Sequence, residues 1–67
     1  MKFQVTEFKT AHEAIEHAVA TDGIAVRLNG QNLVVSETDI DRLMDDGVGF
    51  AYLDDRNGTI VTIPVNP

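Results

Sequence analysis

The chain has 67 residues, a formal net charge of -6 and no cysteine. Its length fits one domain, residues 1–67, with a small core, and the lack of cysteine excludes disulfides and thiolate metal sites. No apolar stretch approaches the ~20 residues of a membrane span and no basic leader precedes an apolar run, so we expect a cytoplasmic protein without membrane contact.

The first third of the chain predicts a strand followed by a helix. Residues 2–8 alternate apolar and polar side chains, as a strand buried on one face does. Thr10 and Glu13 have the spacing of a capping box, in which each side chain bonds the backbone of the other residue. We expect the helix to end at Asp22-Gly23, with Gly23 as its C-terminal stop. The apolar side of this helix consists mainly of small side chains, namely Ala11, Ala14, Ile15, Ala18 and Val19.

The middle of the chain predicts a hairpin and a second helix. Residues 24–35 place Asn29-Gly30 between two apolar runs, and Asn-Gly fits the two-residue turn that joins antiparallel strands. Ser36 and Asp39 then repeat the capping spacing. A second helix is therefore expected directly after the hairpin.

The last third predicts another hairpin after the second helix ends near Asp46. Apolar runs flank Asn57-Gly58, and we expect the turn to span residues 54–58. Pro64 indicates that the final strand lies at a sheet edge or ends there, because proline has no N–H for a ladder bond. The expected fold is α+β: a small antiparallel sheet of about five strands with two short helices, in the order β-α-β-β-α-β-β.

Two histidines and two glutamates on the first helix are the strongest candidates for chemistry. His12-Glu13 begins like the metal-binding helix of zinc proteases, but Glu16 stands where the second histidine would be, and His17 lies about 140° round the helix from His12. On a straight helix the two imidazoles cannot share a metal ion. We expect His12 with Glu16, and Glu13 with His17, to form ion pairs on an exposed face. No catalytic, metal-binding or cofactor-binding residue is assigned, and we predict a protein that is not an enzyme and takes no cofactor.

Acidic residues concentrate on the second helix. Helical spacing spreads them around its surface. Acid–base catalysis instead requires carboxyl groups gathered in an apolar pocket. They form either a solvated face or a docking face for a basic protein partner. The candidates for facing a partner are Glu37, Asp41, Asp45 and Asp46.

Three stretches of the N-terminal two thirds follow a known pattern: Val5-Thr6-Glu7-Phe8-Lys9, Asn29-Gly30-Gln31 and Asp41-Arg42-Leu43. With the β-α-β-β-α order of residues 2–46, they resemble the N-terminal domain of Phd-type antitoxins. The resemblance implies a homodimer that contacts operator DNA, with Lys2, Lys9 and Arg27 as candidate phosphate contacts. Outside that resemblance the acidic net charge disfavours nucleic acid as a partner, because it repels phosphates.

The leading hypothesis is a non-enzymatic protein-interaction module that acts as a homodimer. It rests on a scaffold that leaves no reactive site and on a core small enough to profit from a second chain. The alternative is a DNA-binding autoregulator similar to Phd-type antitoxins.

Overall fold

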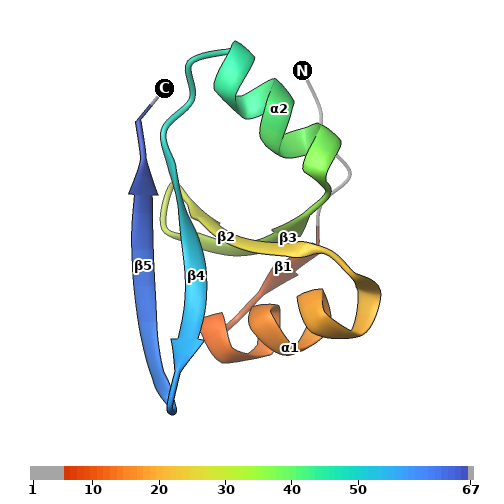
Figure 1. Ribbon diagram of the computed structural model, residues 1–67, viewed down its shortest axis with the longest axis vertical. Helices are drawn as coiled ribbons and strands as arrows, with labels where there is room; N and C mark the ends of the chain where they lie inside the picture. Colours follow the sequence, from red (N-terminus) through yellow and green to blue (C-terminus); the bar gives the residue numbers. More distant parts are fainter. Residues whose placement is uncertain (1–5, 67) are drawn as a thin grey trace.

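The computed structural model describes residues 6–66, so the prediction for strand residues 2–5 and the candidate Lys2 lie outside the described residues. Five strands and two helices follow one another in the predicted order (Figure 1), which confirms the α+β fold. They are β1 (Thr6–Phe8), α1 (Ala11–Thr21), β2 (Ile24–Leu28), β3 (Gln31–Val35), α2 (Glu37–Asp45), β4 (Phe50–Arg56) and β5 (Thr59–Val65).

The five strands form one antiparallel sheet in the order β1-β3-β2-β4-β5. The β2–β3 hairpin turns at Asn29 and Gly30, with φ values of 50° and 76°, which Asn and Gly adopt more readily than other residues. The second hairpin turns in the same way at Asn57-Gly58 and not across residues 54–58 as predicted. Asp54–Arg56 instead continue β4, because a two-residue turn lets the ladder run up to the turn itself.

The sheet buries side chains on both faces, because α1 lies on one side of it and α2 on the other (Figure 1). The larger core lies on the α2 face, where alternate residues of the central strands meet the apolar side of α2. Its buried members are Val26, Leu33, Val35, Ile40, Leu43 and Phe50. The Phe50 and Tyr52 rings meet edge to face, with centroids 5.4 Å apart.

The smaller core lies on the α1 face and is built from small residues. Ala14 and Ala18 of α1 are buried against Ala25 and Leu53 of the sheet. Side chains of this size let α1 approach the strands closely. The approach continues past the helix at Gly23, where a Cβ atom would lie only 2.7 Å from Cγ1 of Val34.

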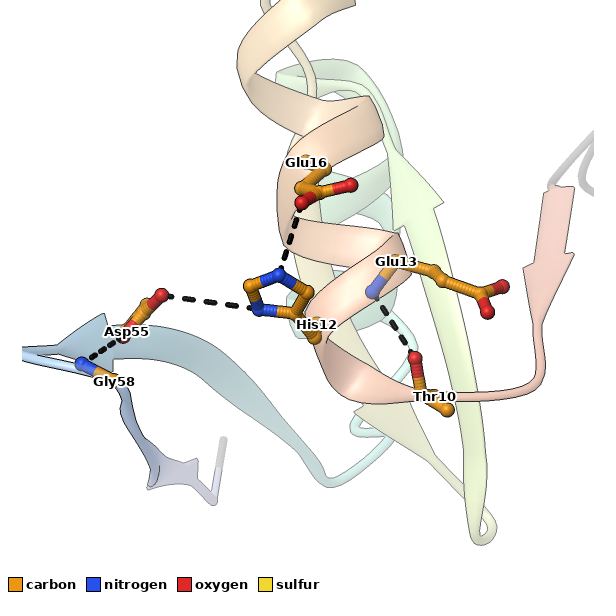
Figure 2. A network of polar contacts seen from close by, with 6 residues as sticks. All are labelled: Thr10, His12, Glu13, Glu16, Asp55 and Gly58. Atoms are coloured by element: carbon orange, nitrogen blue, oxygen red, sulfur yellow. Dashed lines mark hydrogen bonds and ion pairs between the residues drawn. The ribbon is translucent and has the colours of Figure 1, made fainter.

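The two helices begin with different caps. At α2, Ser36 Oγ accepts from the Asp39 N–H at 3.2 Å and the Asp39 carboxylate accepts from the Ser36 N–H at 3.1 Å, so the predicted capping box is complete. At α1, Thr10 Oγ1 accepts from the Glu13 N–H at 3.2 Å. The Glu13 carboxylate points away from Thr10 (Figure 2), so the second bond predicted for this box is absent.

The end of α1 corrects the prediction for Gly23. The residue with left-handed backbone geometry is Asp22, at φ 57° and ψ 33°, whose N–H donates to the Ala18 carbonyl. Gly23 is needed here for the close approach to Val34 and not for positive φ.

The β4–β5 hairpin diverges from the rest of the sheet. β4 and β5 pair along seven positions, whereas β2 and β4 pair at two, Val26 with Tyr52 and Arg27 with Ala51. Beyond Tyr52 the hairpin runs past β2 and beside α1 (Figure 1). This divergence opens a hollow between α1, β2 and β4.

Candidate functional site

The histidine at the start of α1 lies between two carboxylates (Figure 2). His12 Nε2 is 2.9 Å from Oε1 of Glu16, which confirms one predicted ion pair, and His12 Nδ1 is 3.9 Å from Oδ2 of Asp55 on β4. Asp55 also accepts the Gly58 N–H at 2.9 Å, so the second hairpin turn holds this carboxylate in place. The His12 and Glu16 side chains are 62% and 67% exposed, so the cluster lies on an open surface and not in a cleft.

The second histidine of α1 does not join this cluster. The His17 ring packs against Phe8 of β1 with centroids 5.0 Å apart. The predicted pair between Glu13 and His17 is wrong, since residues 6–66 contain no ion pair between them. Over the same residues no group of three or more His, Cys, Asp or Glu side chains is arranged to hold a metal ion.

The four acidic residues considered for partner docking are all exposed. Glu37, Asp41 and Asp45 are four residues apart and therefore share one side of α2, so they are less spread out than predicted. Glu37 differs from the others because it also lines a hollow of about 420 Å³ together with Asp22, Gly23 and Ile24. Asp46 follows the last turn of α2 as its C-cap.

Two of the three residues considered for DNA contact meet around one buried amide. The Asn32 side chain accepts from the Arg27 guanidinium at 3.4 Å and donates to the carbonyls of Phe8 and Lys9 at 3.5 Å. Both Lys9 and Arg27 are exposed. Lys2, the third candidate, lies outside the described residues.

The hollow between α1, β2 and β4, here called the notch, was not predicted. Its volume is about 480 Å³, and its lining includes Ile15 and Val19 of α1, Asp22, Ile24 of β2, and Leu53 and Asp54 of β4. Val19 is 79% exposed, the most exposed large apolar side chain among residues 6–66. Sequence reasoning placed Val19 on the buried side of α1 and had no signal for where β4 leaves β2, because that depends on pairing between distant segments.

A further exposed apolar feature is the outer edge of β5. This strand ends the sheet and, among the residues that the structure describes, pairs with β4 alone. Its seven residues carry no charge and are all β-branched except Pro64. Ile63 is 42% exposed. The edge position that Pro64 predicted is confirmed.

Comparison of the chain with models of known protein families, with curated proteins and with solved structures finds no match. Within residues 6–66 neither helix has the length and apolar character needed to cross a membrane.

Proposed function

We propose that this chain is a non-enzymatic protein-interaction module that forms a homodimer by pairing the β5 edges of two copies. The observation that carries the proposal is the uncharged, β-branched outer edge of a seven-residue strand. Natural edge strands usually carry charges, prolines or bulges that prevent such pairing, and β5 carries only one of these devices, Pro64 near its C-terminal end. In a chain with a net charge of -6, a neutral edge is where two copies approach with the least repulsion.

The backbone groups available on this edge follow from the register. Hydrogen-bonded and non-hydrogen-bonded pairs alternate along an antiparallel ladder, and Pro64 lacks an N–H, so its pair with Ala51 is non-hydrogen-bonded. Thr62, two residues earlier, therefore also points its N–H and carbonyl away from β4. A second β5 running antiparallel bonds these groups and brings the exposed Ile63 side chains of the two copies close together.

Thr62→Pro tests this proposal. It removes an N–H that faces outward while sparing the ladder to β4, and sheet edges tolerate proline. Sedimentation equilibrium of the wild-type protein is expected to give twice the 7.3 kDa mass of one chain. In the variant the dissociation constant of the dimer should rise at least about tenfold. Thr62→Val, which keeps the N–H, serves as the control. A wild type that stays monomeric contradicts the proposal, as does a Thr62→Pro variant that dimerises as the control does.

DNA binding is the second candidate, and the observation that favours it is the shared position of Lys9 and Arg27 around Asn32. Asn32 contacts Lys9 only through its backbone carbonyl, but two basic residues anchored this close together can both reach neighbouring phosphates. A gel shift with DNA from upstream of the coding sequence, at low salt, tests this function. Arg27→Ala should weaken a real complex, whereas no shift by the wild type removes the candidate.

A further inference from the structure

The notch is formed by the divergence of two neighbouring strands. Continuing the register of β2 and β4 would pair Ala25 with Leu53 and then Ile24 with Asp54, but the pairing stops at Val26 and Tyr52. The opening left between the strands is about 480 Å³, within the usual range for a small binding pocket. It is therefore large enough to take one or two side chains from another molecule.

The notch presents apolar surface that no residue of 6–66 covers fully. Ile15 and Ile24 line it and are half-buried, Leu53 lines it with 8% of its surface exposed, and Val19 lines it with 79% of its surface exposed. Val19 follows Ile15 by one helical turn, so the two side chains are neighbours on α1. An apolar side chain inserted here gains contacts with all four residues.

The charged residues that line the notch are acidic. Asp22 and Asp54 line it, Glu37 lines the adjoining hollow beyond Asp22, and neither lining contains Lys, Arg or His. Arg56 pairs with Asp54 at 3.0 Å, but among residues 6–66 no base lies within ion-pair distance of Asp22. Asp22 also follows the last turn of α1, where the helix dipole adds negative potential. The Asp22 carboxylate and the helix dipole therefore both favour a cation beside Asp22.

From the apolar lining and the acidic rim together, we infer that the notch binds a segment of a different protein that presents an apolar side chain next to a Lys or Arg. The apolar side chain enters between Val19 and Leu53, and the cation lies beside Asp22. This inference rests on the proposed role of the chain as a protein-interaction module and does not require the β5 homodimer.

Three labelled hexapeptides provide the probe: one alternates Leu and Lys, one alternates Leu and Glu, and one alternates Ser and Lys. Fluorescence anisotropy should show binding of the Leu-Lys peptide, and amide shifts of ¹⁵N-labelled protein should concentrate at Val19, Asp22 and Leu53. The other two peptides should bind at least about tenfold more weakly, since each lacks one of the two recognised groups. If the Ser-Lys peptide bound as tightly as the Leu-Lys peptide, net charge alone would explain the binding, and the inference would be overturned.

Val19→Lys and Ala20→Lys form a matched pair of variants. Both positions are exposed on α1 and both changes add the same charge, but only Val19 lines the notch. Val19→Lys should weaken Leu-Lys binding at least about tenfold while Ala20→Lys changes it by less than about threefold. Asp22→Asn should weaken binding and flatten its salt dependence. Equal effects of the two Lys variants contradict the assignment of the notch.

Sedimentation of the same variants separates this inference from the proposed homodimer. Val19→Lys should leave the oligomeric state unchanged, because β5 does not line the notch. If Val19→Lys converted the dimer to a monomer, the occupant of the notch would be a second copy of the chain, and the inference would be overturned. A monomeric wild type that still binds the Leu-Lys peptide at the notch would refute the homodimer alone, and a dimer that does not bind it would refute the notch alone.

Discussion

Asp22 conflicts with a local rule at the end of α1, because its carboxylate follows the negative end of the helix dipole. Its backbone has φ 57°, a left-handed region that aspartate adopts more readily than most residues but less readily than glycine. Residues that break local rules without structural compensation are concentrated at functional sites. The position of Asp22 in the proposed notch fits that expectation.

Replacing Asp22 by glycine should therefore stabilise the fold. We expect Asp22→Gly to raise the free energy of unfolding by about 0.5 kcal/mol, because glycine adopts positive φ without steric cost. Asp46→Gly is the matched control, since Asp46 also caps a helix end but has φ -83°. That change should lower stability by a similar amount. Urea denaturation of both variants measures the difference, and a change of the same sign in both would show that φ does not matter here.

Single residues also mark where sequence reasoning succeeds and where it stops. The Ser36 capping box and the Asn29-Gly30 turn were predictable because each depends on residues within four positions of one another. The sequence predicted Gly23 as the stop of α1, whereas the left-handed residue is Asp22 and Gly23 instead lies close to Val34, a neighbour distant in the sequence.

At the scale of elements, α1 and α2 use side chains of different size to cover the two faces of the sheet. α1 packs through Ala14 and Ala18, whereas α2 packs through Ile40 and Leu43. The alanines let α1 lie close to the strands, and the larger residues of α2 fill the larger core. The periodicity of the sequence predicted both helices, but it did not determine strand order or the face that each helix covers.

Enlarging a buried alanine of α1 should therefore be costly. We expect Ala14→Leu to lower the free energy of unfolding by about 1–3 kcal/mol, because Ala14 has no exposed surface and the strands beneath it leave no room. Ala20→Leu, on the exposed side of the same helix, should change it by less than about 0.5 kcal/mol. Thermal denaturation compares the two variants. A well-tolerated leucine at position 14 would mean that α1 can move away from the sheet.

At the scale of the whole molecule, the apolar core is divided into two thin parts. In the described chain six buried apolar residues lie on the α2 face and four on the α1 face. A domain of this size has little stability to spare, and a second chain is a common way to add to it. The length and composition of the sequence predicted a small core, but its division between two faces depends on where the helices pack.

If dimerisation contributes to stability, the melting temperature must depend on protein concentration. Mass action predicts that Tm rises by about 3–5 °C for each tenfold increase in concentration of the wild-type chain. The Thr62→Pro variant should show a smaller dependence over the same concentrations, because its dimer dissociates more readily. Differential scanning calorimetry over a concentration series measures both, and a wild-type Tm that does not change would argue against association in the folded state.

The two edges of the sheet differ, and under the proposed β5 pairing this difference would limit the size of the assembly. Over its described length β1 offers three residues, one of them the charged Glu7, whereas β5 offers seven neutral ones. Joining β5 of one copy to β1 of the next is a head-to-tail contact that builds a ring or a filament, but the charge of Glu7 makes the described part of β1 a poor acceptor for it. Joining β5 to β5 uses the same surface twice around a two-fold axis and leaves no second β5 free. If two copies pair through β5 as proposed, an edge that is complementary chiefly to its own copy would close the assembly at two chains.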